Sequence, residues 1–153
     1  MIAYHLSIKN GDLFDGKYHV IGQIGNGSYG DVYKVLDHKG EVYALKVLRL
    51  WEIMGDLHEG LIRRFEQEYK VMRISSEYLV HSLDFGTVQG NPFILMEYCP
   101  KGDLSKFISQ DSSKIALYAC DILQGLYALH REGKVHRDLK PENVLLRQNG
   151  KAA

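Results

Sequence analysis

Eight residues decide how this sequence is interpreted: His136-Arg137-Asp138-Leu139-Lys140-Pro141-Glu142-Asn143. They bring together a carboxylate, two cationic side chains and an amide, and the proline stiffens the backbone of a loop. A carboxylate can accept a proton, a lysine can neutralise developing negative charge, and an amide oxygen suits a hard cation. The pattern therefore predicts a loop that places a hydroxyl group and holds one side of a metal site. The apolar run Val144-Leu145-Leu146 after it predicts a short strand.

The composition of the chain fits one globular domain. It has 153 residues, of which 45% are hydrophobic, which is enough for a core. Its 19 acidic and 19 basic residues balance, so we expect neither a nucleic-acid partner nor a polybasic membrane surface. Residues Met1 to Asp12 hold no apolar run of signal-peptide length, and no segment approaches the about 20 apolar residues of a membrane span. Cys99 and Cys120 form neither a disulfide framework nor a metal pattern, so we expect a reduced, cytoplasmic setting.

A glycine-rich loop lies near the start of the chain, at Gly25-Asn26-Gly27-Ser28-Tyr29-Gly30-Asp31-Val32. Its glycines let the backbone approach phosphate groups closely, with N–H groups turned toward anionic oxygens. The pattern predicts strands at Tyr18 to Ile24, Val32 to Leu36 and Glu41 to Leu48, with a turn at Asp37-His38-Lys39-Gly40. A dinucleotide-binding loop must open a helix, and this loop does not. Taken alone, it is also compatible with a hairpin that binds no ligand.

The predicted strand from Glu41 to Leu48 carries another candidate site residue, Lys46. A period of two places Val42, Ala44, Lys46 and Leu48 on one face. Ala44 is small enough for a flat ring to lie against it, and Lys46 then extends toward the phosphates of a nucleotide. An ordinary strand lysine is the alternative, and the glycine-rich loop upstream argues against it.

A helix is predicted from Leu57 to Ile74. Its apolar face carries Leu61, Phe65 and Met72, and the same face carries Glu68. A carboxylate on an apolar face needs a partner, and Lys46 is the natural one. Glu66 is the rival, but at 100° per residue it lies about 200° away from Glu68 and is expected to face solvent.

The remaining elements are predicted from their apolar patterns and turns. Two strands are expected at Tyr78 to Phe85 and Phe93 to Tyr98, and a short helix at Asp103 to Gln110. A longer helix is expected from Ser112 or Ser113 to Arg131.

The longer helix is apolar on most of its circumference, which predicts burial on most sides. We expect exposed apolar surface around Ile122, Leu126 and Leu129, and hence self-association of the chain.

The stretch His136 to Asn143 resembles the catalytic loop of protein kinases, H-R-D-L-x-x-x-N, and Lys140 is typical of the serine/threonine type. Residues 25–32 resemble the kinase glycine-rich loop, Tyr43-Ala44-Leu45-Lys46 the strand-lysine motif, and Phe65-x-x-Glu68 the helix glutamate. Residues 94–104 resemble the hinge. Because five features occur in the family order over residues 18 to 149, the chain is identified as a member of the eukaryotic-type (Hanks-type) serine/threonine protein kinases, here as the N-terminal portion of the domain.

The resemblance implies transfer of a phosphoryl group from MgATP to a Ser or Thr hydroxyl of a protein substrate. It implies that Asp138 handles the hydroxyl proton, that Lys140 stabilises the transferred phosphoryl group, and that Asn143 binds Mg²⁺. A Lys46–Glu68 ion pair would orient the lysine toward the phosphates. The ATP-binding residues implied are Ile24, Gly25, Gly27, Gly30, Val32, Ala44, Lys46, Met96, Glu97, Cys99, Asp103 and Leu145.

The resemblance also implies an α+β fold. A five-stranded antiparallel sheet with one helix forms a small lobe at residues 18–98, preceded by an N-terminal extension at 1–17. Residues 99–153 are the hinge and a partial large lobe with its first helices and the catalytic loop.

The family pattern continues with a strand and D-F-G, whose Asp holds the principal Mg²⁺, and no residue after Asn143 replaces it. We therefore expect the 153-residue chain alone not to phosphorylate proteins. Two other functions stay open. One is a non-catalytic nucleotide-binding or interaction module, such as a kinase fragment or pseudokinase. The other is a small-molecule phosphotransferase, although those typically carry H-G-D.

Overall fold

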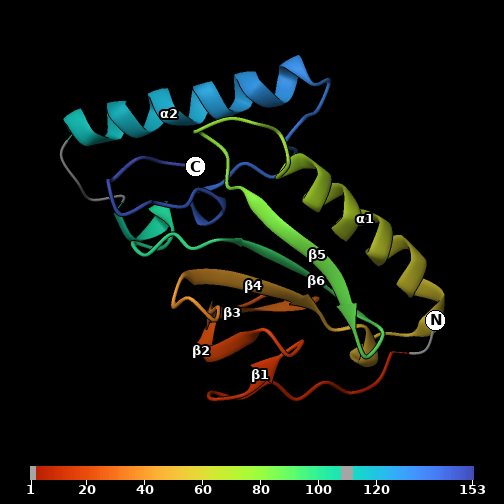
Figure 1. Cartoon of the computed structure of the whole chain (residues 1–153). Helices are drawn as coiled ribbons and strands as arrows, with labels where there is room; N and C mark the ends of the chain where they lie inside the picture. The colour runs from red at the N-terminus through yellow and green to blue at the C-terminus, as the bar shows by residue number, and fades with distance from the viewer. Residues whose placement is uncertain (1–2, 108–111) are drawn as a thin grey trace. The chain divides into compact units, whose positions relative to one another are not determined.

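The computed structural model describes residues 3–107 and 112–153. The chain divides into two compact units, of which the first comprises Met1–Lys70 and Ser82–Tyr98 and the second Val71–His81 and Cys99–Ala153. Figure 1 shows the strands of the first unit and the helix α2 of the second. The assignment of Val71–His81 to the second unit is a feature that the sequence analysis did not anticipate.

The first unit is built on a six-stranded antiparallel sheet in the order β1-β2-β3-β4-β6-β5. The strands are β1 (Leu13–Phe14), β2 (Tyr18–Asn26), β3 (Gly30–Leu36), β4 (Val42–Leu48), β5 (Ser82–Val88) and β6 (Asn91–Glu97). All five strands expected for the sheet are present. The sixth, β1, has two residues and lies in the expected N-terminal extension, where it pairs with β2.

The largest shift in a strand boundary concerns β5, which begins at Ser82 and not at Tyr78. The carbonyl oxygens of Glu77 and Leu79 accept hydrogen bonds from the Arg147 guanidinium, the second at 3.0 Å. Lys151 forms an ion pair with the Glu77 side chain at 2.5 Å. The segment before Ser82 is therefore bonded to side chains within the second unit and does not extend the strand.

One face of the sheet carries the hydrophobic core of the first unit. The buried residues come from alternate positions of the strands, as the period of two requires: Phe14, Val20, Tyr33, Val35, Leu45, Val47, Phe93 and Leu95. Leu6 and Ile8 of the N-terminal segment pack against this cluster. Residues 3–12 are therefore part of the folded unit.

The fully buried side chain of Asn91 fastens this N-terminal segment to the sheet. Its Oδ1 accepts a hydrogen bond from the Leu50 N–H at 3.2 Å. Its Nδ2 donates to the carbonyl oxygens of Tyr4 at 2.9 Å and Gln89 at 3.1 Å. One amide thus joins three segments that are far apart in the sequence.

Helix α1 (His58–Val71) runs along β5 (Figure 1) and buries Phe65. The Phe65 ring lies 6.3 Å from the Phe85 ring between centroids, and the Tyr69 ring lies 5.0 Å from Phe85. The observed helix starts one residue later and ends three residues earlier than expected.

The second unit is organised around helix α2 (Ser112–Arg131), whose bounds match those expected. Tyr118 and Ile122 pack against a small cluster formed by Val144, Leu146 and Ala152. The expected strand at 144–146 is instead a pair of isolated bridges, Asp103 with Leu145 and Leu146 with Ala152. The expected helix at Asp103 to Gln110 is a short 3-10 helix at Leu104–Phe107, and residues 108–110 lie outside the described residues.

The predicted exposed patch on α2 was wrong. Leu129 is only 1% exposed, and Ile122 and Leu126 are half-buried, because this side of the helix faces the segments around Leu79 and Val144. The exposed apolar residues lie on other sides of the helix: Ile115, Leu117, Leu123 and Tyr127. Self-association of the chain stays a prediction.

Gly125 marks the closest contact between α2 and the segment before β5. A Cβ atom at this position would lie 2.6 Å from the carbonyl oxygen of Tyr78.

Among the described residues, no helix has the length and apolar character needed to cross a membrane.

Candidate nucleotide-binding and catalytic residues

The candidate site residues fall into two groups, one in each unit. The first unit holds Ile24, Gly25, Gly27, Gly30, Val32, Ala44, Lys46, Glu68, Met96 and Glu97. The second unit holds Cys99, Asp103, Asp138, Lys140, Asn143 and Leu145.

The expected ion pair between Lys46 on β4 and Glu68 on α1 is present, with Lys46 Nζ 2.5 Å from Glu68 Oε1. The Lys46 ammonium also lies 5.8 Å from the centroid of the Phe65 ring. The two side chains are 30% and 36% exposed, so solvent screens their attraction and the pair contributes little to stability. Its main effect is to hold the lysine side chain in one direction.

Lys46 shares its sheet face with several other candidates. Residues directly opposite one another on paired strands point to the same face, as do alternate residues along one strand. Val32 is opposite Lys46, and Ala44 is opposite Met96. This face, which we call the lysine face, is therefore defined by Val32, Ala44, Lys46 and Met96. Leu45 and Val47 point to the other face, into the core.

Glu97 is opposite Tyr43 and so points away from the lysine face. Its predicted part in binding ATP stays a prediction.

The three glycines of the loop differ in what the fold demands of them. A Cβ at Gly30 would lie 2.6 Å from the Val47 carbonyl oxygen, so the pairing of β3 with β4 itself excludes a side chain. A Cβ at Gly25 or Gly27 would have its nearest contact at 3.4 Å, from Val32 and from the Gly30 carbonyl oxygen. Internal packing therefore leaves room for a side chain at Gly25 and Gly27, and does not by itself require glycine at either position. Ile24 beside them is 49% exposed.

The catalytic-loop candidates in the second unit contact one another directly. Lys140 Nζ lies 3.2 Å from Asp138 Oδ2. Asn143 Nδ2 donates to Asp138 Oδ2 at 3.0 Å and to the Asp138 carbonyl oxygen at 2.8 Å. A short 3-10 helix at Pro141–Asn143 brings the amide back toward Asp138, and Arg137 before it adopts the left-handed backbone conformation with φ of 62°.

These two contacts lower the pKa of the exposed Asp138 carboxyl, first through the Lys140 hydrogen bond and then through Asn143. Since the lowered pKa favours the charged form, Asp138 stays an available proton acceptor as the pH falls toward its usual pKa.

We expect Lys140→Met and Asn143→Ala each to raise the pKa of Asp138, because each removes a group that stabilises the carboxylate. The titration can be followed by the NMR shift of the Asp138 carboxyl carbon. Lys134→Met, which removes another exposed lysine, is the control and should leave the titration in place. An Asp138 titration that is the same in all four proteins would show that the contacts do not persist in solution.

The remaining candidates lie where the chain enters the second unit. Cys99 is buried, and Asp103 bridges to Leu145. Asp103 Oδ1 accepts hydrogen bonds from the Ser105 hydroxyl and from the Ser105 N–H at 3.1 Å. The Ser105 hydroxyl is the main cause of the lowered pKa of the Asp103 carboxyl. Asp103 Oδ2 also lies 3.4 Å from Lys106 Nζ, so both oxygens have local partners, and the expected part of Asp103 in binding ATP stays a prediction.

Sequence reasoning missed Arg49, which donates a hydrogen bond from NH2 to the Gly27 carbonyl oxygen at 2.8 Å. The sequence offered one signal. Arg49 is a basic residue directly after β4, and Asp31 is an acidic residue of the glycine motif on the neighbouring strand β3. Opposite charges on neighbouring strands favour contact, but no motif singles out this pair.

Comparison with known proteins agrees with these arrangements. The sequence profile of the family described as "Protein kinase domain" matches residues 18–152. The chain belongs to this family. The glycine-rich loop, the Lys46–Glu68 pair and residues 136–143 all lie within the matched residues.

The relatives of this kinase domain include serine/threonine kinases. The "Probable serine/threonine-protein kinase pknA2" of Bifidobacterium longum is 29% identical over 144 residues, covering 90% of this chain. The "Serine/threonine-protein kinase hippo" of Drosophila melanogaster is 35% identical over 143 residues, covering 88% of this chain. The chain spans only 19% and 20% of the lengths of these two proteins.

A solved structure described as "PpkA-294 apo form" matches this kinase domain with a TM-score of 0.85. The match covers 96% of this chain and 60% of that one. Because the sequence identity is 20%, the likeness shows the fold alone.

Proposed function

We propose that this chain binds MgATP and takes part in phosphoryl transfer to a serine or threonine hydroxyl of a protein substrate. The observation that carries the proposal is the lysine face. It combines Ala44, a small residue against which a flat ring can lie, with Lys46, whose ammonium is held by the Glu68 carboxylate. The glycine-rich loop precedes them in the chain, and its internal packing does not require glycine at positions 25 and 27. A nucleotide needs these elements together: an apolar surface for the base, a cation and backbone N–H groups for the phosphates.

In this proposal the residues of the first unit bind and orient the nucleotide. Lys46 pairs with phosphate oxygens, and Glu68 keeps the ammonium from turning away. Val32, Ala44 and Met96 contact the base on the lysine face, and the backbone of the glycine loop covers the phosphates.

The catalytic loop handles the substrate hydroxyl. The oxygen–phosphorus bond forms while the bond from the γ-phosphorus to the β–γ bridging oxygen breaks, and ADP leaves. Asp138 orients the hydroxyl and accepts its proton, and its lowered pKa keeps it ionised for this task. Lys140 neutralises charge on the transferred group.

Asn143 fits Mg²⁺ as one oxygen ligand, because its Nδ2 is bonded to Asp138 and its Oδ1 is then the atom for a cation. The described residues contain no group of three His, Cys, Asp or Glu side chains placed to hold a metal ion, so phosphate and water oxygens would supply further ligands. The ion supplies positive charge that offsets the charge of the phosphates.

The nucleotide part of the proposal is tested by calorimetric titration of the 153-residue chain with MgATP. Lys46→Met should lower the affinity about tenfold or more, because it removes the cation that pairs with phosphate. Lys39→Met, which removes an exposed lysine in the turn between β3 and β4, should leave the affinity unchanged. Absence of binding to the unsubstituted chain, or equal affinity in Lys46→Met, would overturn the proposal.

Phosphoryl transfer is measured separately, with labelled ATP and a mixture of serine- and threonine-containing peptides. Transfer that disappears in Asp138→Asn would support the catalytic role of this loop and would contradict the expectation that the 153-residue chain alone does not phosphorylate proteins. Binding of MgATP without any transfer would leave the chain as a nucleotide-binding module, as the alternative interpretation holds.

A further inference from the structure

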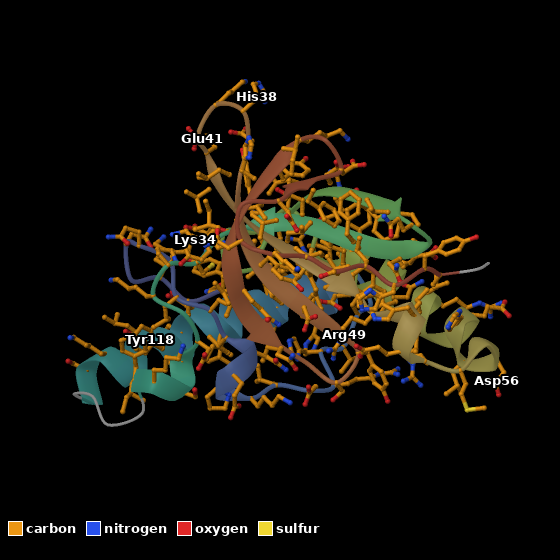
Figure 2. The ribbon with its side chains drawn as sticks, turned by 90° about the horizontal axis from the view of Figure 1, so that it is seen from below. Lys34, His38, Glu41, Arg49, Asp56 and Tyr118 are labelled. Carbon is orange, nitrogen blue, oxygen red and sulfur yellow. The ribbon has the colours of Figure 1, made fainter. Side chains whose placement is uncertain are left out.

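Arg49 directly follows β4 and contacts the glycine-rich loop at several points. Its NH2 donates to the Gly27 carbonyl oxygen at 2.8 Å, and its backbone N–H donates to the Tyr29 carbonyl oxygen, also at 2.8 Å. Arg49 lies at the end of the β2–β3 hairpin, since Gly30 pairs with Leu48 beside it (Figure 2). Both carbonyls belong to the loop tip, where residues 26–29 are exposed.

The Arg49 side chain is itself held by Asp31. NH1 of Arg49 lies 3.7 Å from Asp31 Oδ1, and the two side chains are 17% and 10% exposed. Glu52 Oε2 lies 3.4 Å from Arg49 Nε, an ion-pair contact without hydrogen-bond geometry. A guanidinium that is poorly exposed and lies between two carboxylates has a more fixed orientation than a solvated guanidinium.

Asp31 is in turn fixed by residues of the sheet. Its Oδ1 accepts a hydrogen bond from Gln23 Nε2 at 3.0 Å, and its Oδ2 accepts one from the Tyr33 hydroxyl at 3.3 Å. Burial raises the pKa of Tyr33 to about 12, and the neighbouring Asp31 charge acts in the same direction, so the hydroxyl stays a donor. A chain of contacts therefore runs from the sheet through Asp31 and Arg49 to the loop tip.

The chemical consequence concerns which backbone groups the loop presents. A loop with exposed glycines has many conformations, and ordering it on binding costs conformational entropy. The carbonyl oxygens of Gly27 and Tyr29 would repel phosphate, and both are occupied by donors from Arg49. The tip is thereby pre-ordered with its carbonyls engaged. The Gly27 N–H donates to the Gly30 carbonyl oxygen at 2.8 Å, so the remaining N–H groups of the tip are favoured as the ligands for anionic oxygens.

We propose that Arg49, held by Asp31, is a positioning residue that orders the glycine-rich loop for the phosphates of the nucleotide. This inference rests on the proposed function, because it assigns a further residue to the same site. Arg49 acts through the loop backbone, and its effect depends on the presence of phosphates on the ligand.

The experiment compares Arg49→Met, Arg49→Lys and Asp31→Asn with the unsubstituted chain. Two properties are measured: the affinities for MgATP and for adenosine by calorimetry, and the hydrogen exchange of the amides of residues 27–30 in the ligand-free chain. Arg63→Met on α1, which breaks an exposed ion pair with Glu59, is the matched control.

We expect Arg49→Met to lower the affinity for MgATP about tenfold and to speed exchange of the tip amides by a similar factor, because one charge-assisted hydrogen bond is lost. The affinity for adenosine, which lacks phosphates, should be unchanged. Arg49→Lys should recover part of the affinity, because one ammonium can reach the carbonyl or the carboxylate but cannot match the fork of arginine. Asp31→Asn should give a smaller loss with the same selectivity for MgATP.

Equal losses for MgATP and adenosine would mean that Arg49 only stabilises the fold, and unchanged affinity for MgATP would remove its role altogether. Either result overturns the inference. If Arg49→Met does not fold, the Arg49→Lys and Asp31→Asn proteins test the inference in the same way. The loss of affinity for MgATP is then compared with the loss of affinity for adenosine in each protein. If the unsubstituted chain binds no nucleotide, the proposed function fails and the phosphate role fails with it, while the exchange of the ligand-free chain still shows whether Arg49 orders the loop.

Discussion

Asn91→Ala is expected to lower the free energy of unfolding by about 2–4 kcal/mol, one of the larger effects available to a single substitution in this chain. The Asn91 side chain is completely buried and takes part in three hydrogen bonds, to Leu50, Tyr4 and Gln89. Alanine would remove all three and leave the Leu50 N–H and the Tyr4 carbonyl oxygen without this partner, while the Gln89 carbonyl oxygen still accepts a hydrogen bond from the Tyr4 N–H at 3.0 Å. The N-terminal segment, whose Leu6 and Ile8 pack against the core, would also lose one of its attachments, while its backbone hydrogen bonds to Gln89 and Val20 remain.

Chemical denaturation followed by circular dichroism measures this effect, with Asn10→Ala as the control because Asn10 is exposed. The control should stay within about 0.5 kcal/mol of the unsubstituted chain. A loss below about 1 kcal/mol in Asn91→Ala would mean that water replaces the amide, and that the Asn91 side chain does not fix the N-terminal segment to the sheet in solution.

Gly125→Ala should also destabilise the chain, by about 1–3 kcal/mol, although alanine is the better helix former. The new methyl group would lie 2.6 Å from the Tyr78 carbonyl oxygen, so α2 or the segment around Tyr78 must move. That segment gives way poorly because Arg147 and Lys151 bind it on both sides of Tyr78. The backbone around Tyr78 therefore has little freedom to move away from the added methyl group.

Gly60→Ala provides the matched comparison, because Gly60 lies in α1 and has no atom within 4 Å of an added Cβ. Here the same change should raise the free energy of unfolding by about 0.5–1 kcal/mol, through helix propensity alone. Both variants can be followed by the same denaturation experiment. Stabilisation by both would show that α2 and the Tyr78 segment are not in close contact in solution.

The sequence predicted the elements of the first unit well where a local pattern controls them. The alternation in β4 placed Ala44 and Lys46 on one face, and the position of Glu68 on the apolar side of α1 predicted its contact with Lys46. Both inferences need only the periods of strand and helix. The strand β1 escaped prediction because two residues are too short to show a pattern.

Features that depend on distant contacts could not be derived in this way. The segment at Tyr78 was expected to be a strand because its apolar residues suit one, and only Arg147, about 70 residues away, shows why it is not. Helix α2 is apolar on most sides, so its sequence could not tell which side packs, and Leu129 was placed wrongly. Arg49 was missed because its partners are a carbonyl oxygen and a buried carboxylate, which no residue pattern reveals.

The alternation of β4 also limits how this protein can change during evolution. Leu45 and Val47 fill the core while Ala44 and Lys46 point to the lysine face, so one short strand carries both functions at interleaved positions. Deleting or inserting a single residue there would exchange the two sets, burying the lysine and exposing the core residues. Under the proposed function, substitutions within β4 can therefore tune which nucleotide the chain prefers. Changes in length are confined to places such as the exposed turn at residues 38–40, where no such exchange follows.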